Sequence, residues 1–320
     1  MKFRDQLRLK LHKTIPEDLV PLLPSGIQFI STIAILNLKE ELHEFKEPIG
    51  NAVMELLPKT TAVWVRTGTI SGQFRTPEGL EHVCGSTETE IIHTENKIRY
   101  KFDFTKIMFA KGNVAERARL PILVQENEFI VDMFAGIGYF SLGIAKYAKP
   151  KQIYSIELNP ISYSYLEENI RINKLTNTIK PIHGDCSEET KNLSKQGIKA
   201  DRVIMGVFPA PYDYITAALT VIKPKKLVIN TKVETFLKNT ATKPHFDIYK
   251  SGISTQNTIV HFEGVVMGRD FTEFYQKVQD HLHLEGFDSS IVAVRFVKSF
   301  GPKMWHLVLD LAVGIKANNL

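Results

Sequence analysis

The sequence contains few cysteines: Cys84 and Cys186 are the only two among 320 residues. Two thiols so far apart in the chain argue against a disulfide framework and a cysteine-rich metal site, and they favour a reducing compartment. The ten histidines are scattered without the spacing of metal ligands, so we expect no bound metal.

Long apolar runs and a leader segment are also lacking. The longest apolar stretch, residues 27–38, is interrupted by Gln28, Ser31, Thr32 and Asn37, and it is too short and too polar to span a bilayer. The first eight residues are too charged for a signal peptide. We therefore expect a cytoplasmic protein with no membrane association, and nothing in the sequence predicts an obligate protein partner.

The overall composition excludes little. The net charge of +5 is compatible with a nucleic-acid partner, but many soluble enzymes are equally basic. A hydrophobic content of 43% and a charged content of 23% are ordinary for a folded protein. A length of 320 residues slightly favours two domains over one.

The first 105 residues have the pattern of an α+β domain. One strand is expected at 27–36, a helix with apolar positions on one side at 39–57, and short strands at 62–66, 80–84, 88–93 and 98–104. We interpret this domain as one that binds RNA and forms part of the cleft in which the RNA would bind.

From residue 106 to 320, strands and helices alternate. Asn113 and Glu116 have the spacing of a capping box that would start a helix. Strands are expected at 129–134, 152–157, 179–183 and 202–205, with helices at 139–148 and 161–173 between them. This alternation predicts an α/β fold with a doubly wound parallel sheet. Residues 291–297 and 304–311 are typical of a closing antiparallel pair, and the polar segment 226–258 is a possible insertion.

Polar and glycine residues follow three successive strands, where a doubly wound sheet binds ligands. The first strand, which includes Asp132, ends at Phe134 and leads into Gly136 and Gly138. Glu157 closes the second strand, where a carboxylate can accept two ribose hydroxyls, and Asp185 follows the third, within reach of an adenine amine. Together these features predict a pocket for S-adenosylmethionine (SAM).

A nicotinamide dinucleotide is the rival ligand. Its fingerprint needs a third glycine or alanine to seat the pyrophosphate, and Ser141 stands at that position. The motif also begins late in the chain and carries Asp132 within the strand, which counts further against a dinucleotide.

Five segments resemble one superfamily closely: residues 106–109, 112–117, 132–140, 201–206 and 304–310. That superfamily joins the tRNA guanine-37 N1-methyltransferases to the wybutosine-pathway enzymes that act at the same nucleotide. The resemblance extends from about residue 15 and is weak at 226–258. It implies a class I SAM-methyltransferase-like (Rossmann-like) catalytic domain and a tRNA substrate.

Two details favour one branch of the superfamily. The methyltransferases typically carry Asn-Pro-Arg before the helix and Asn-Leu-Pro after the fourth strand, whereas this chain has 111–113 as Lys-Gly-Asn and 206–209 as Gly-Val-Phe-Pro. Gly206 has no side chain to hold an attacking amine, which favours a carbon nucleophile. The chain is more similar to the tRNA wybutosine-synthesizing protein 2 family. Those enzymes transfer the 3-amino-3-carboxypropyl group of SAM to C7 of 4-demethylwyosine at position 37 of tRNA-Phe, within the anticodon loop, and release methylthioadenosine.

The resemblance also implies roles for individual residues. Ala110 and Arg117 would lie near the methionine part of SAM, and Arg117 would pair with the transferred carboxylate. Asp185 and Cys186 would flank the adenine. The family usually has Ser at the position of Ala110 and Asp-Asn at 185–186, so a hydroxyl contact and an amide contact are lost here.

Three questions stay open at this level. His261 and Glu263 resemble a His-rich strand near the family's site, although a structural role is the simpler interpretation of His261. Basic and aromatic residues could bind RNA: Arg66, Gln73, Phe74, Arg75, Lys106 and Lys298. A tRNA methyltransferase, or a non-catalytic RNA-binding subunit that retains the SAM fold, remains an alternative function.

Overall fold

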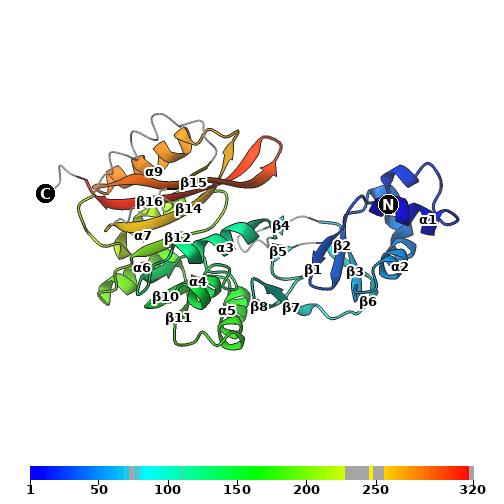
Figure 1. The fold of residues 1–320 in the computed structure, drawn as a ribbon, viewed down its shortest axis with the longest axis horizontal. Helices are drawn as coiled ribbons and strands as arrows, with labels where there is room; N and C mark the ends of the chain where they lie inside the picture. Colours follow the sequence, from blue (N-terminus) through cyan, green and yellow to red (C-terminus); the bar gives the residue numbers. More distant parts are fainter. Residues whose placement is uncertain are drawn as a thin grey trace. The chain divides into compact units, whose positions relative to one another are not determined.

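Two units make up the chain, Met1–Ala110 and Lys111–Leu320, and each is described by itself (Figure 1). The computed structural model describes residues 1–316 except 69, 72–75, 78, 110, 228–244 and 248–255. The domain boundary expected at residue 105 lies close to this division. Most of the possible insertion at 226–258 lies outside the described residues.

The first unit combines short helices with a small mixed sheet. Its sheet has the order β1-β2-β3-β6, and the hairpins β4-β5 and β7-β8 stand apart from it. Helices α1 and α2 share an apolar core with β2 and β3. The elements are α1 (Phe3–Leu11), η1 (Val20–Leu22), β1 (Gln28–Ile30), β2 (Ile33–Leu36), η2 (Glu40–Phe45), α2 (Lys46–Leu56), β3 (Ala62–Arg66), β4 (Ile70–Ser71), β5 (Thr76–Pro77), β6 (Leu80–Gly85), β7 (Glu90–Glu95) and β8 (Ile98–Asp103).

The single strand predicted at 27–36 is wrong in detail, because the segment folds back on itself as the antiparallel hairpin β1-β2. The reversal occurs at Ser31, which has a φ of 52°. A continuous apolar pattern does not show a two-residue turn unless the turn carries glycine, asparagine or proline, and this one does not.

The second unit is built on one eight-stranded sheet with the order β11-β10-β9-β12-β14-β16-β15-β13. The strands from β11 to β14 are parallel, and β16 pairs antiparallel with both β14 and β15. The order reverses between β9 and β12, so the adjacent ends of these strands form the topological switch point. The described elements are η3 (Lys111–Asn113), α3 (Val114–Leu123), β9 (Phe129–Asp132), α4 (Ser141–Tyr147), β10 (Gln152–Glu157), α5 (Pro160–Ile172), β11 (Ile179–His183), α6 (Cys186–Lys195), β12 (Arg202–Met205), η4 (Tyr212–Tyr214), α7 (Ile215–Val221), β13 (His245–Asp247), β14 (Thr258–Met267), α9 (Thr272–Leu284), β15 (Phe287–Gly301) and β16 (Met304–Ile315).

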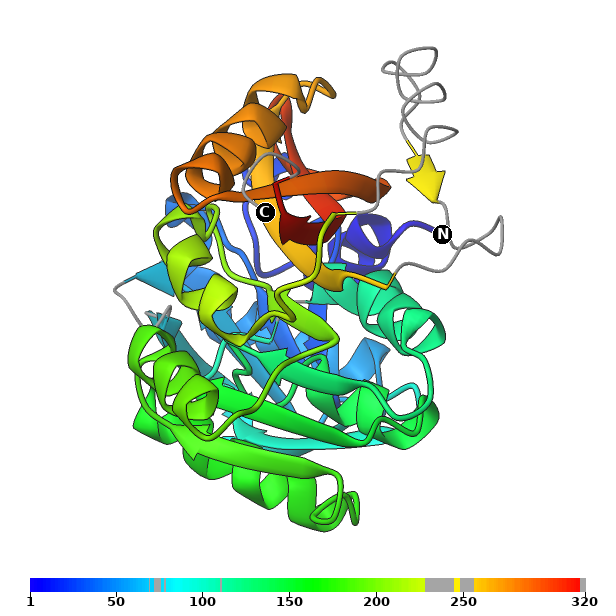
Figure 2. The same ribbon diagram turned by 90° about the vertical axis from the view of Figure 1, so that its left-hand side faces the viewer.

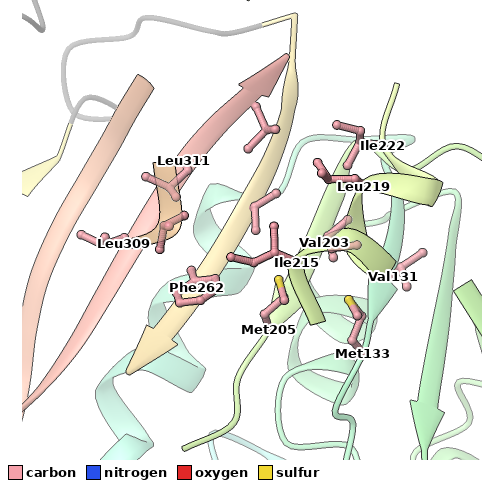
Figure 3. Packing of buried hydrophobic residues seen from close by; sticks show 14 of the residues in the cluster. Val131, Met133, Val203, Met205, Ile215, Leu219, Ile222, Phe262, Leu309 and Leu311 are labelled. Atoms are coloured by element: carbon pink, nitrogen blue, oxygen red, sulfur yellow. The ribbon is translucent and has the colours of Figure 1, made fainter. Parts of the chain in front are cut away.

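The predicted doubly wound sheet and the closing antiparallel pair are therefore confirmed. Helices pack on both faces of the sheet (Figure 2). The face covered by α6, α7 and α9 is apolar, and side chains from β9, β12, β14 and β16 belong to one buried cluster with Ile215 and Leu219 of α7 (Figure 3). Each large aliphatic side chain buried in this way contributes about 1.5–3 kcal/mol to folding.

The opposite face of the sheet is covered by α3, α4 and α5, and it is much more polar. Because side chains alternate along a strand, the residues between the apolar ones point to this face. Seven buried polar or charged side chains lie on it: Asp132, Ser155, Arg202, His261, Glu263, His306 and Asp310. A sheet buried on both faces is normally apolar on both, so a polar layer on one face is unusual.

Candidate cofactor and active site

The first parallel strand, β9, leads into a tight glycine turn at the carboxyl edge of the sheet. Gly136 and Gly138 have φ values of 57° and 97°, a region that favours glycine. A Cβ on Gly136 would lie 2.5 Å from the ring of Tyr139, and one on Gly138 would lie 2.7 Å from the side chain of Leu142. Glycine is therefore required at both positions, because any side chain there would clash with Tyr139 or Leu142.

Glu157, the last residue of β10, holds this turn in place. Its Oε2 accepts a hydrogen bond from the N–H of Gly136 at 2.7 Å, and its Oε1 accepts one from the N–H of Asn159 at 2.8 Å. Burial raises the pKa of the carboxyl group, and the backbone hydrogen bonds act against that rise. Each oxygen keeps a further lone pair, so the carboxylate can still accept two vicinal hydroxyls.

Asp185 and Cys186 stand where β11 gives way to α6. Asp185 is the N-cap of α6, and its side chain accepts a hydrogen bond from the N–H of Ser187 at 2.7 Å. Cys186 is buried in the apolar core, and burial together with the nearby Asp185 raises the pKa of its thiol to about 12. The thiol therefore stays protonated at neutral pH.

Asp132 lies beneath the glycine turn and is fully buried. Its Oδ2 accepts a hydrogen bond from the hydroxyl of Ser141 at 2.7 Å, and Ser155 donates to Ser141 in turn. Burial raises the pKa of Asp132 to about 6. In this position the carboxylate supports the start of α4 from below.

Two further predicted residues lie around the turn, and a third is not described. The ring of Phe134 meets that of Tyr214 edge-on, with centroids 5.1 Å apart. Arg117 on α3 is 5% exposed, and its guanidinium lies 5.9 Å from the ring centroid of Tyr139. Ala110 lies outside the described residues.

Gly206 follows β12 at the switch point, and its lack of a side chain has a packing reason. A Cβ there would lie 2.8 Å from the ring of Phe140 and 3.7 Å from Oε2 of Glu263. The parallel pairing of Met205 with Phe262 places Glu263 beside Gly206 on the next strand. The space that a side chain after β12 would fill is thus occupied by the aromatic ring that begins α4.

Of the residues predicted to bind RNA, three are described. In the first unit, Arg66 donates to the side chain of Gln28 at 3.3 Å, and Lys106 lies 3.4 Å from a carboxylate oxygen of Asp103. In the second unit, the side chain of Lys298 packs directly against Gly112, in the space that a Cβ there would need. Gln73, Phe74 and Arg75 lie outside the described residues.

The capping box predicted at Asn113 and Glu116 is wrong. Asn113 is the N-cap of α3, but its side chain makes no capping hydrogen bond. Glu116 points instead into the polar layer of the sheet, where Nη1 of Arg119 donates to it at 2.7 Å. Sequence reasoning missed Arg119 and Asp310. The available signals were a Glu–Arg pair at i,i+3 and isolated charges within apolar strands.

Neither a cluster of metal ligands nor a membrane-spanning helix occurs in the described part of the chain. No three His, Cys, Asp or Glu side chains among these residues are arranged to hold a metal ion. No helix among them combines the length and the apolar character needed to cross a membrane.

The strand order, the antiparallel β16 between β14 and β15, and the glycine turn opposite an acidic strand end define a class I SAM-methyltransferase-like protein. The residues present fit a nucleoside with a free ribose diol, because Glu157 stands at the carboxyl edge of the sheet beside the glycine turn and retains acceptor capacity.

Comparison with known proteins gives the family. The TYW2 N-terminal domain matches residues 7–89, and the TRM5/TYW2 methyltransferase domain matches residues 91–243. A tRNA(Phe) (4-demethylwyosine(37)-C(7)) aminocarboxypropyltransferase of Pyrococcus horikoshii is 32% identical over 314 residues, which cover 97% of both chains. The chain therefore belongs to the tRNA wybutosine-synthesizing protein 2 branch of the TRM5/TYW2 family, as its motifs predicted.

One further relative and one solved structure are similar to the chain over most of its length. The tRNA (guanine(37)-N(1))-methyltransferase Trm5b of Pyrococcus abyssi is 29% identical over 300 residues, covering 93% of this chain and 78% of that protein. The crystal structure of P. horikoshii TYW2 in complex with MeSAdo superposes with a TM-score of 0.72 at 28% identity and covers 97% and 99% of the two chains.

Proposed function

We propose that this protein is a SAM-dependent transferase that moves the 3-amino-3-carboxypropyl group of SAM to C7 of 4-demethylwyosine at position 37 of tRNA-Phe. The observation that carries the proposal is the 32% identity to an enzyme of that name over 97% of both chains. The glycine turn and Glu157 supply the matching donor site.

The reaction is a displacement at a carbon bound to the sulfonium of SAM. A bond forms between C7 of the base and the γ-carbon of the aminocarboxypropyl group while the bond from that carbon to sulfur breaks. The electron pair goes to sulfur, which leaves as the neutral thioether of methylthioadenosine, and C7 loses its proton. All three carbons on the sulfonium are activated, so the enzyme selects one by the way it orients the donor toward the acceptor.

The residues of the pocket divide the work of holding SAM. Glu157 accepts the ribose hydroxyls, while Asp185 and Cys186 flank the adenine. Gly136 and Gly138, with Phe134, border the nucleoside, and Asp132 supports the turn from beneath. Arg117 pairs with the carboxylate of the methionine arm, because a guanidinium presents two parallel donors to a carboxylate. The segment at Ala110 adjoins the same arm.

The acceptor side favours a carbon nucleophile. An enzyme that methylates a ring or exocyclic nitrogen benefits from a polar side chain after the fourth strand, and here Gly206 leaves that place to the ring of Phe140. The alternative function is guanine-37 N1-methylation, and the 29% identity to Trm5b is the observation that supports it.

The first unit, through Arg66 and its neighbours, and Lys298 of the second unit contact the tRNA around the anticodon loop. A single-stranded loop is the easiest place to turn a base out of its stack. The protein works in the cytoplasm, in keeping with its two unpaired thiols, and requires no protein partner.

One assay tests the reaction. tRNA-Phe carrying 4-demethylwyosine is incubated with the protein and with SAM labelled either in the methyl group or in the carboxyl group. We expect the carboxyl label in the tRNA and one methylthioadenosine released for each label incorporated. The control is tRNA-Phe with unmodified guanine-37, which should accept neither label. Transfer of the methyl label alone, to either tRNA, would contradict the proposal and favour the methyltransferase.

A further inference from the structure

The polar layer under α3 is a continuous chain of buried charges. On α3, Arg119 donates from Nη1 to Oε1 of Glu116 at 2.7 Å and from Nη2 to Oδ2 of Asp310 at 3.1 Å. The other oxygen of Asp310, on β16, lies 2.7 Å from Nδ1 of His261 on β14. Helix α3 is thus tied to two strands of the sheet through a single carboxylate.

The chain of charges continues in both directions. At one end, Nε of Arg295 on β15 lies 3.3 Å from Oε2 of Glu116. At the other end, Glu263 lies 3.5 Å from Nε2 of His261 and 3.4 Å from Nε2 of His306. The ring of His306 meets that of Phe208 edge-on, with centroids 4.7 Å apart, in the segment that follows β12. The network therefore extends from α3 to the segment that follows β12.

Burying these groups is expensive. Glu116, Asp310, His261 and Glu263 are 0% exposed, and Arg119 is 8% exposed. Each charge removed from water loses several kcal/mol of hydration, and apolar side chains of similar volume often hold two elements together as well or better. What an ionic network adds is a unique register between elements, because a shifted helix would leave a charge unpaired.

That register matters because α3 also carries Arg117. Successive residues on a helix are about 100° apart, so Arg117 faces away from its neighbour Glu116 and toward the glycine turn. Its guanidinium lies over Tyr139, while Glu116 and Arg119 point into the sheet. Any rotation or slide of α3 would carry the guanidinium with it, and a shift of about 1 Å at a reacting group can lower a rate by about a hundredfold.

We propose that the buried network centred on Asp310 and His261 is a positioning device that fixes α3, and through it Arg117, so that the aminocarboxypropyl arm of SAM faces the acceptor base. Asp310, His261 and Arg119 are then positioning residues that decide which bond to sulfur breaks. This inference rests on the proposed function, because it names the residues that decide which group of SAM the proposed reaction transfers.

The test measures selectivity as well as rate. Asp310→Asn keeps the shape of the side chain but removes the charge that holds Arg119 and His261. The full-length variant is assayed with the two labelled forms of SAM and with tRNA-Phe carrying 4-demethylwyosine. We expect kcat for aminocarboxypropyl transfer to fall at least about tenfold, the ratio of methyl to carboxyl label in the tRNA to rise, and methylthioadenosine release to exceed tRNA modification.

The matched control is Leu309→Ala, one residue away on the same strand. Leu309 points to the apolar face of the sheet (Figure 3), opposite the face that carries the network. It should lower the melting temperature and leave both ratios at their wild-type values. If Asp310→Asn behaves in the same way, with activity lost only in proportion to folded protein, the network is structural and the inference is overturned.

Arg119 provides an independent arm should Asp310→Asn fold poorly. Arg119→Gln removes the link from α3 to Asp310, whereas Arg119→Lys keeps a cation that can reach one carboxylate but not both. The inference predicts the largest loss of selectivity in Arg119→Gln and an intermediate loss in Arg119→Lys, and equal ratios in both would contradict it. Wild-type protein in the same assay tests the proposed function separately: methyl transfer by the wild type would refute the function, whereas unchanged ratios in the variants would refute only the positioning role.

Discussion

Glu157 combines two tasks at the scale of a single residue. Its two oxygens accept backbone hydrogen bonds from Gly136 and Asn159, which fixes the glycine turn relative to β10. The same oxygens are the acceptors proposed for the ribose hydroxyls. Because the carboxylate is fixed before SAM arrives, little side-chain entropy is lost on binding.

Glu157→Gln should therefore weaken SAM binding. The amide replaces one acceptor oxygen by an N–H₂ group. That group cannot accept a hydrogen bond from the backbone N–H that faces it. Hydrogen bonds to a charged group are worth about 1.5–3 kcal/mol, so we expect Kd to rise about tenfold to a hundredfold in calorimetric titration with SAM. Glu167→Gln, on the exposed side of α5, is the control and should leave Kd unchanged. An unaltered Kd in Glu157→Gln would remove this residue from the SAM site.

At the scale of elements, two helices of the second unit begin in different ways. Asn159 caps α5 through its side chain, which accepts from the N–H groups of Ile161 at 2.9 Å and Ser162 at 3.4 Å. Asn113 occupies the same position on α3 without a capping hydrogen bond, and α3 is held by the charges on its buried face. The two helices should respond differently to loss of the N-cap side chain.

Asn159→Ala should destabilise the protein by about 1 kcal/mol, the usual value for a lost N-cap, whereas Asn113→Ala should lower the free energy of unfolding by clearly less. Urea unfolding of the two variants and the wild type, followed by circular dichroism, provides the comparison. Equal losses would mean that Asn113 stabilises α3 after all.

The elements that sequence analysis predicted well are those whose signal is local. Alternating strands and helices between residues 129 and 205 have their own apolar periodicity, and Glu157 and Gly136 follow from their places at strand ends. The polar network could not be predicted in this way. Arg119 and Asp310 are 191 residues apart, and neither shows from its neighbours in the sequence that the other is its partner. The capping box failed because Glu116 accepts a hydrogen bond from Arg119 on the same helix, and Arg119 is in turn bound to Asp310 on a strand far away in the sequence.

At the scale of the whole second unit, the two faces of the central sheet differ in character: one forms the main apolar core, and the other carries the buried charges. The face against α6, α7 and α9 is apolar and forms the main core. The face against α3, α4 and α5 carries the buried charges, and the glycine turn and the acidic strand end lie at the carboxyl edge. Removing a side chain from the apolar face should change stability, and removing one from the polar face should also change the chemistry.

The polar face should give the protein a characteristic pH dependence. Burial disfavours the charged form of His261, but Asp310 and Glu263 outweigh it and raise the pKa of His261 to about 10. Burial raises the pKa of both carboxyls, but hydrogen bonds and charges from His261 and His306 hold the pKa of Glu263 at about 2. Against the same effect of burial, His261, Arg119 and Arg202 hold the pKa of Asp310 below its usual range. The carboxylates therefore contribute stability above about pH 4, which is lost in acid.

His261 contributes stability with the opposite sign. Its stabilising charge is fully present below about pH 6.5, the pKa of an unfolded histidine, and is lost as the pH rises through 10. Asp132, whose pKa burial raises to about 6, loses its contribution between about pH 4 and 6 and is already ionised above that. Between about pH 6.5 and 8.5, before unfolded thiols ionise, the slope is therefore dominated by His261.

We expect the free energy of unfolding to fall across this window by up to about 1.4 kcal/mol per pH unit, since the folded state holds one proton that the unfolded state has released. His261→Asn keeps a donor near Asp310 but cannot take up a proton, so the slope should largely disappear. Urea titrations at three pH values in this window, for the wild type and the variant, measure both slopes. Parallel slopes would mean that His261 is neutral in the folded protein, and the chain of alternating charges from Glu116 to Glu263 would then be broken at its centre.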